Sequence, residues 1–185
     1  MAAAAHLSPI VRTGEAADAS ACAAIYAPYV EGTVISFEQV APSVELMGER
    51  ITSALATHAW LVLEDPVDGQ VLGYAYGGPY KERAAYAWSC EVSVYVDRGR
   101  QRSGHGRALY LALFERLARR GYRTAVAGMT LPNPASQGLH RSMGFEDVGT
   151  WREIGWKSGA WHDVHWMQRS LVPDEARQQG PSELT

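Results

Sequence analysis

The chain has 185 residues, of which 46% are hydrophobic and 20% charged, a balance typical of one soluble globular domain with a sizeable core. Seventeen basic and twenty acidic residues give a formal charge of −3, so no overall basic field points to nucleic acid or a membrane surface. The two cysteines, Cys22 and Cys90, are too few for a disulfide framework and show no metal-ligand spacing.

The N-terminal stretch lacks the basic and apolar segments of a secretory signal. No apolar run approaches the roughly 18 residues of a membrane span. We therefore expect a cytosolic protein. We also expect a single domain over residues 9–172, with flexible tails at 1–8 and 173–185.

The N-terminal half of the chain contains two stretches with helical spacing of apolar residues. Asp18 to Tyr29 is the first, and Pro28 marks its expected end. The second covers residues 44–57, with Ser43 as its N-cap. Alternating or β-rich runs bounded by turn residues predict the strands of this half at 9–13, 33–37, 59–64, 70–77 and 86–96.

In the C-terminal half, Leu109, Leu113 and Leu117 form an apolar stripe on a helix expected from Gly104 to Arg120. The remaining predicted elements are a strand at 124–129, a helix at 135–143 and strands at 145–156 and 160–171. No internal repeat and no linker divides the chain. The fold class is therefore mixed α/β (α+β), with helices flanking a mostly antiparallel sheet.

Residues 91–113 read as a strand, a basic turn containing glycines, and a helix. In the turn Gln101 to Gly106 the glycines allow main-chain N–H groups to converge, and the following helix adds its own unpaired donors and positive dipole end. Such a junction binds anions, most often phosphate or pyrophosphate. A P-loop would need a lysine after the second glycine, and a dinucleotide fold would place the turn in an early βαβ unit. Neither pattern fits.

The motif Gln101-x-x-Gly104-x-Gly106, after a strand ending Val94-Tyr95-Val96, resembles the acyl-CoA turn of the GNAT superfamily of N-acetyltransferases. A second motif, Asn133 to Phe145, resembles the N-x-x-S-x-x-L-H/Y-x-x-x-G-F pattern of that superfamily. Further segments are similar to the phosphinothricin N-acetyltransferase family, namely 35–38, 73–76, 83–96 and 159–169. The resemblance runs from about residue 10 to 171.

This resemblance implies the GNAT fold, with a sheet that is splayed at a bulge, and acetyl-CoA as co-substrate, with no metal. The main chains of Val94 and Val96 would bind the pantetheine arm, and Asn133 would bond its pantetheine or adenosine portion. Main-chain N–H groups of the turn would hold the pyrophosphate, from Arg102, Ser103, Gly104, His105, Gly106 and Arg107.

Acetyl transfer to an amine requires a base, because a free amine is mostly protonated near pH 7. Glu91 is an acidic residue in an otherwise apolar or small run, where burial would raise its pKa. The family resemblance implies the same role, and the alternative is a salt-bridged or edge-facing carboxylate. An N–H group near Val94 would stabilise the developing oxyanion. His140 stands where many GNAT enzymes carry a tyrosine, and acts there either as the acid for the leaving thiolate or as a structural histidine.

Cys90 is the only nucleophile near Glu91, and alternation along the strand turns it to the opposite face. We therefore expect direct transfer in a ternary complex. The family acts on small amino acids with a phosphinate, sulfone or sulfoximine side chain. The implied substrate positions are Phe37, Glu38, Lys81, Arg83 and Tyr86. Arg83 could instead be a surface residue, and Phe37 a core residue.

Two other functions stay open: acetylation of a protein or peptide amine on the same fold, and a non-catalytic acyl-CoA-binding module. The resemblance further implies a homodimer, and a role in resistance to an antibiotic or herbicide-like compound. Trp161 and His162 would shape either the site or the dimer contact.

Overall fold

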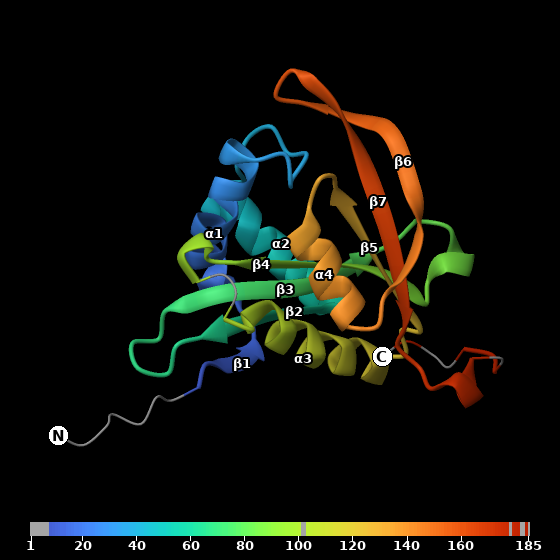
Figure 1. Cartoon of the computed structure of the whole chain (residues 1–185). Coiled ribbons are helices and arrows are strands. Elements are labelled where there is room, and N and C mark those ends of the chain that lie inside the picture. The colour runs from blue at the N-terminus through green and yellow to red at the C-terminus, as the bar shows by residue number, and fades with distance from the viewer. Residues whose placement is uncertain (1–7, 101–102, 178, 182–183, 185) are drawn as a thin grey trace.

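The computed structural model describes residues 8–100, 103–177, 179–181 and 184. It begins with a short strand, β1 (Ile10–Thr13), followed by helices α1 (Ala19–Gly32) and α2 (Val44–Thr57). The predicted N-cap of α2 is confirmed, because the Ser43 hydroxyl accepts a hydrogen bond from the Leu46 N–H. Figure 1 shows both helices on the same side of the sheet.

The predicted end of α1 at Pro28 is wrong. The helix continues through Gly32 with Pro28 inside it. Tyr29 and Val30 are both buried in the core, and this burial favours one more helical turn despite the hydrogen bond that proline cannot donate. The Thr33 hydroxyl then donates to the Tyr29 carbonyl at 2.6 Å at the end of the helix.

The strand predicted at residues 33–37 is also wrong, because this segment forms bends in the loop between α1 and α2. Its hydroxyl groups accept local main-chain hydrogen bonds. The Ile35 N–H donates to the Thr33 hydroxyl, and the Glu38 N–H donates to the Ser36 hydroxyl. Such local bonds compete with strand pairing.

Seven strands form one sheet in the order β1-β2-β3-β4-β5-β7-β6. All neighbouring strands are antiparallel except β4 and β5, which are parallel. After β1, the strands are β2 (Ala59–Glu64), β3 (Val71–Pro79), β4 (Ser89–Val96), β5 (Thr124–Thr130), β6 (Glu146–Lys157) and β7 (Ala160–Ser170). The strand predicted from residue 86 begins only at Ser89, because Ala84–Tyr86 forms a 3₁₀ turn. The fold class is confirmed.

Helices cover both faces of the sheet. Met47 and Ile51 of α2 join α1 residues and Trp60, Val62 and Tyr74 of the sheet in one core. On the other face lie α3 (His105–Arg119) and α4 (Pro134–Ser142). The predicted α3 stripe of Leu109, Leu113 and Leu117 is fully buried there.

The sheet opens in its middle. The parallel strands β4 and β5 pair only at Ser89–Glu91 with Thr124–Val126. Beyond that point β5 diverges from β4, while β3 and β4 continue without a register shift over seven residue pairs. The opening therefore arises from the divergence of β5, and the bulge expected in this region is not seen in the β3–β4 pairing.

Among the described residues, no helix is long and apolar enough to cross a membrane. The same part of the chain has no group of three or more His, Cys, Asp or Glu side chains that could hold a metal ion.

Candidate active site

The gap between β4 and β5 exposes main-chain groups of β4. The Asp97 N–H donates to the Leu72 carbonyl of the β3 strand at 2.9 Å. Because hydrogen-bonding direction alternates along an antiparallel strand, the N–H and C=O groups of Val94 and Val96 point away from β3, toward the gap. The Val96 carbonyl already accepts a hydrogen bond from the Tyr29 hydroxyl at 2.5 Å. The other main-chain groups of Val94 and Val96 point into the gap, where an extended chain could pair with them, and their contact with the pantetheine arm stays a prediction.

The glycine turn lies at the end of this gap, where α3 begins. Gly104 is the N-cap of α3 and has a φ of 79°, a left-handed conformation that favours glycine. The Ala108 N–H donates to the Gly104 carbonyl at 3.0 Å, the first bond of the helix. The N–H groups of the three helical residues before Ala108 therefore have no acceptor within the helix. Two residues of the predicted motif, Gln101 and Arg102, lie outside the described residues.

Gly106 allows the start of α3 to approach β4 and α4 closely. A methyl group on Gly106 would stand 3.2 Å from Leu139 of α4 and within about 4 Å of Val94 and Val96. Arg107, on the same turn, donates to the Ser142 carbonyl of α4. The predicted cofactor residues His105, Gly106 and Arg107 therefore lie together beside the gap. The donor set is a helix N-terminus with glycines, which fits a pyrophosphate group.

Asn133 is the N-cap of α4, and its side-chain oxygen accepts from the Ser136 N–H at 3.1 Å. Its side-chain NH₂ is the part that can contact a ligand. The predicted contact between Asn133 and the coenzyme stays a prediction.

Glu91 lies where the sheet begins to open, opposite Gly78 of β3 and Val126 of β5. Cross-strand partners share a face, so the Glu91 side chain lies on the α1/α2 face, in line with Ser93 and Tyr95. A side chain added at Gly78 would meet open space. Burial raises the pKa of the Glu91 carboxyl. Within the described chain Glu91 takes part in no ion pair.

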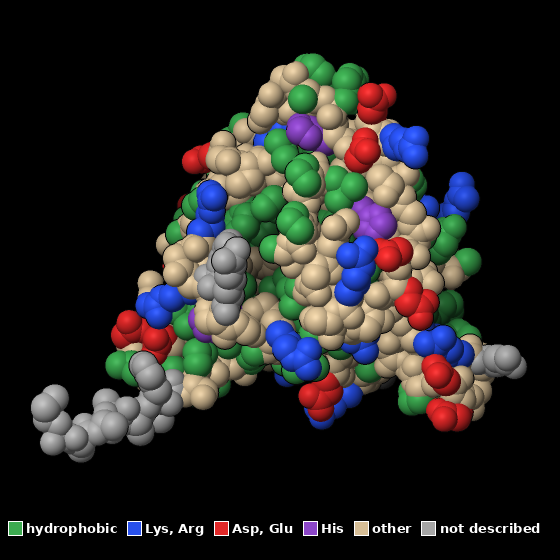
Figure 2. Space-filling view, viewed as in Figure 1, with side chains coloured by type: hydrophobic (Ala, Val, Ile, Leu, Met, Phe, Trp, Pro, Cys, Tyr) green, Lys and Arg blue, Asp and Glu red, His purple; other side chains and the backbone are tan. Residues whose placement is uncertain are grey.

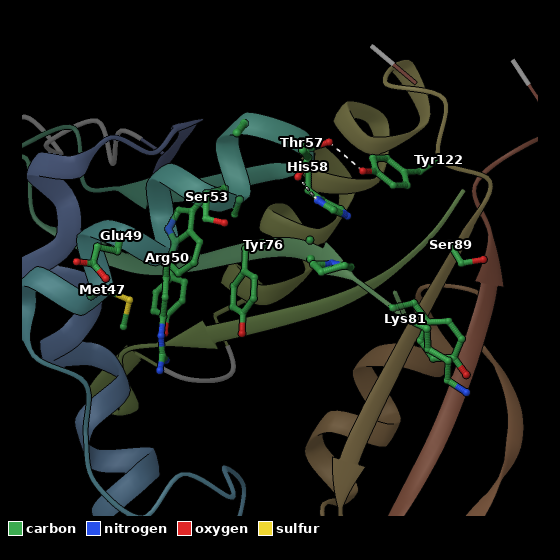
Figure 3. Close-up of a pocket in the computed structure, with 18 of the residues that line it drawn as sticks. Met47, Glu49, Arg50, Ser53, Thr57, His58, Tyr76, Lys81, Ser89 and Tyr122 are labelled. Carbon is green, nitrogen blue, oxygen red and sulfur yellow. Dashed lines mark hydrogen bonds between the residues drawn. The ribbon is translucent and has the colours of Figure 1, made fainter. Parts of the chain in front are cut away.

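A cavity of about 960 Å³ lies on this same face, between α2, the end of β3 and the loop that leads to β4. Gly78, the partner of Glu91, belongs to its wall and Glu91 itself does not, so the cavity reaches the strand pair that carries the carboxylate. Figure 3 shows Arg50 of α2 and Tyr76 of β3 side by side, pointing the same way, with Lys81 on the opposite side. Tyr76 is the cross-strand partner of Ser93, two residues from Glu91.

Lys81 and Tyr86, two of the predicted substrate residues, lie in the cavity wall. The Lys81 ammonium stands 5.0 Å from the ring centre of Tyr80 and 5.4 Å from that of Tyr86. These cation–π contacts hold a positive charge at the wall. Arg83 is exposed and does not line the cavity.

Glu38 also lines the cavity, but its carboxylate is already engaged. Arg50 donates to both of its oxygens, at 2.8 and 3.0 Å, and the Tyr26 hydroxyl donates to one of them at 2.9 Å. Burial alone would raise the pKa of Glu38, but these hydrogen bonds outweigh burial and lower it. Phe37 lies outside the cavity wall, with its ring against Gly155 of β6.

His140 is a residue of α4, is 4% exposed and points into the core. Its Nδ1 is 2.8 Å from the Ser136 carbonyl and its Nε2 is 3.1 Å from the Tyr110 hydroxyl. A carbonyl can only accept, so Nδ1 carries the proton and Nε2 accepts from Tyr110. Burial lowers the pKa of the ring. This is the geometry of a structural histidine, the alternative raised by the sequence, and the acid role stays a prediction.

Sequence reasoning missed the wall residues Tyr26 and Arg50. Arg50 falls on the polar side of an amphipathic helix, where an arginine normally means solvent exposure. Its partner Glu38 is twelve residues away, in a loop, at a distance that no periodicity indicates. Tyr76, also in the wall, belongs to one of the family-like segments, so the sequence carried a signal for it.

Comparisons with known proteins find relatives in sequence and in fold. Residues 11–166 match the family model of the acetyltransferase (GNAT) domain. The phosphinothricin N-acetyltransferase of Streptomyces viridochromogenes is 37% identical over 161 residues, covering 87% of each chain. The L-methionine sulfoximine/L-methionine sulfone acetyltransferase of Pseudomonas aeruginosa is 34% identical, covering 90% of this chain and 97% of its own length.

Among solved structures, a GNAT superfamily phosphinothricin acetyltransferase from Sinorhizobium meliloti in complex with AcCoA superposes with a TM-score of 0.89. The two sequences are 32% identical, and the match covers 96% of this chain and 95% of the other.

Proposed function

This chain belongs to the GNAT family of acetyltransferases, and from that premise we propose that it acetylates the amino group of a small amino acid. It is an acetyl-CoA-dependent N-acetyltransferase. The proposed acceptors carry a phosphinate, sulfone or sulfoximine side chain, such as phosphinothricin, methionine sulfone or methionine sulfoximine.

The observation that carries the proposal is the position of Glu91. This carboxylate lies at the point where the sheet opens, and its partner on β3, Gly78, belongs to the wall of the cavity. Acetyl-CoA, when bound, supplies an acetyl group activated as a thioester. The start of α3, with Ser103 to Arg107, would hold its pyrophosphate, and the main chains of Val94 and Val96 its pantetheine arm.

On the acceptor side, Glu91 would take a proton from the ammonium group so that the neutral amine can attack. A raised pKa suits this role, because the carboxylate then binds the proton more readily. Lys81 would attract the anionic or polar end of the amino acid, and Tyr86 would form the wall beside it. Glu38 would act indirectly, by fixing Arg50.

The test is release of free thiol from acetyl-CoA across a panel of amines: phosphinothricin, methionine sulfone, methionine sulfoximine, polyamines and peptides. We expect turnover with the first three amino acids. Turnover with peptides alone would replace this proposal with the protein-amine alternative. No turnover with any amine would favour a non-catalytic acyl-CoA-binding module.

We expect the transfer to proceed without an acyl-enzyme. Cys90 is fully buried in the core on the face opposite Glu91, and burial raises the pKa of its thiol to about 12. A Cys90→Ala variant should therefore keep more than about a tenth of the wild-type kcat. Steady-state kinetics under the same thiol-release assay check this, and a larger loss would indicate a covalent role for Cys90.

We also propose that the enzyme is a homodimer that works in the cytoplasm and confers resistance to compounds of the phosphinothricin type. Two free, buried cysteines suit a reducing compartment.

Exposed apolar side chains on the β6–β7 hairpin suit the contact of a homodimer: Val148, Trp151, Ile154, Trp156 and Trp161. Figure 2 shows hydrophobic side chains at the hairpin tip. Sedimentation at micromolar concentration should give twice the chain mass, and a monomer would contradict the dimer.

A further inference from the structure

The tip of the β6–β7 hairpin meets the loop between α1 and α2, more than a hundred residues away in the sequence. Figure 1 shows the hairpin arching toward this loop. Lys157, the last residue of β6, is only 5% exposed. Its ammonium group donates to the carbonyl of Val30, in the last turn of α1, at 2.5 Å, and to the carbonyl of Ser36 at 2.7 Å.

Burying an ammonium group is unfavourable unless its donors are satisfied. Desolvation lowers the pKa of Lys157, and within the described chain this lysine forms no ion pair. Its partners are main-chain carbonyls instead, one of them at the negative end of a helix dipole. The interaction therefore fixes the position of the main chain at Ser36.

Two more contacts join the same segments. An ideal Cβ built on Gly155 would lie 2.1 Å from the Phe37 ring, so this ring occupies the space above the glycine. The Gln39 side chain donates to the Trp156 carbonyl at 3.4 Å. We call this set the clasp: Gly155, Trp156 and Lys157 of β6 against Val30, Ser36, Phe37 and Gln39.

The clasp continues directly into the wall of the acceptor cavity. The hydroxyl groups of Ser36 and Tyr26 are 2.7 Å apart and hydrogen-bonded. Tyr26 donates to Glu38, which is held on its other side by Arg50 of α2. Tyr26, Glu38 and Arg50 all line the cavity. A displacement of Ser36 would therefore move three wall residues through a continuous hydrogen-bonded chain.

We propose that Lys157 is a positioning residue that sets the affinity for the acceptor amine by holding residues 35–39 in place through the clasp. The inference rests on the proposed function, since it concerns the same cavity. The coenzyme gap is bordered by other residues, at the start of α3 and along β4. Loss of the clasp should thus weaken acceptor binding and leave coenzyme binding unchanged.

The first test is Lys157→Met, which keeps the aliphatic stem and removes the donors. The acceptor KM should rise roughly tenfold or more, as expected when hydrogen bonds from a charged group are lost. The KM for acetyl-CoA should be unchanged and kcat much less affected than the acceptor KM. Thr150→Val is the matched control, because it removes one hydrogen bond within the same hairpin, to His165, and none to the loop. Its acceptor KM should equal the wild-type value.

A second variant, Gly155→Ala, tests the clasp should Lys157→Met fail to fold. Its methyl group would displace the Phe37 ring, so the acceptor KM should rise here too. Amide hydrogen exchange gives a readout that does not need turnover: residues 35–39 should exchange faster in either variant than in the wild type.

The outcomes are separable. The clasp would be overturned, whichever amine is the substrate, by either of two results. One is amide hydrogen exchange at residues 35–39 of the variants at the wild-type rate, and the other is an unchanged acceptor KM in Gly155→Ala. An equal rise in KM for the acceptor and for acetyl-CoA would also overturn the clasp, because it would indicate general destabilisation. No turnover with any amine would refute the proposed function alone, and the exchange measurement would still decide the clasp.

Discussion

Replacing Glu91 by glutamine should lower kcat by about 100- to 10,000-fold at neutral pH, the range for loss of a general base. Glutamine keeps the shape of the side chain but cannot accept the proton of the acceptor ammonium. Rising pH should restore part of the activity, because the free amine then becomes abundant without help from the enzyme. The KM for acetyl-CoA should not change, since the coenzyme is expected to contact the main chain of β4. Stopped or continuous thiol-release assays across pH give all of these values.

The pH dependence of the wild-type kcat/KM is a second test of Glu91 as the base. Burial raises the pKa of Glu91, and only the deprotonated form can act as base. The kcat/KM for the acceptor should therefore rise with pH through that raised pKa and level off above it, until other groups titrate. Glu115→Gln is the matched control, because Glu115 is exposed on α3 and pairs only with Arg119 in the described structure. Wild-type kinetics in Glu91→Gln would remove Glu91 from the mechanism.

Replacing Gly104 by valine should raise the KM for acetyl-CoA by roughly tenfold or more. The left-handed conformation at Gly104, with a φ of 79°, disfavours any residue with a Cβ by about 1–2 kcal/mol, and a β-branched one most of all. The main chain would relax toward negative φ and turn its N–H groups away from the anion site. The acceptor KM should change little, because the acceptor cavity lies on the other face of the sheet.

The control for this strain is Gly69→Val, in the turn between β2 and β3. Gly69 has a φ of 72°, and, like Gly104, has open space where a Cβ would lie. Both variants should lower the free energy of unfolding by a similar amount, as measured by denaturant titration. Only Gly104→Val should weaken binding of the coenzyme. An equal rise in KM for both variants would show that global stability, and not the turn, controls binding.

The glycine turn could be predicted from the sequence because its chemistry is local. A positive φ, a helix start and a preceding strand each have a recognisable sequence pattern, and all three patterns fall within about ten residues. The N-cap at Ser43 and the stripe of α3 were predictable for the same reason. The opposite orientations of Cys90 and Glu91 followed from strand alternation alone.

The wrong and missing predictions concern segments whose structure is determined by contacts with residues far away in the sequence. Pro28 should end a helix in isolation, yet the burial of Tyr29 and Val30 extends α1 past it. The ion pair of Glu38 with Arg50 joins a loop to a helix face that looks solvent-exposed in the sequence. Lys157 lies 121 residues from Ser36, and nothing in the periodicity of either segment indicates that they meet.

The opening between β4 and β5 has different neighbours on the two faces of the sheet. The start of α3 and the side chains of Val94 and Val96 border it on one face, and the cavity with Tyr76 and Arg50 lies on the other. In the proposed arrangement the donor and the acceptor approach Glu91 from opposite faces of the sheet. We therefore expect that acetyl-CoA and the acceptor can bind in either order.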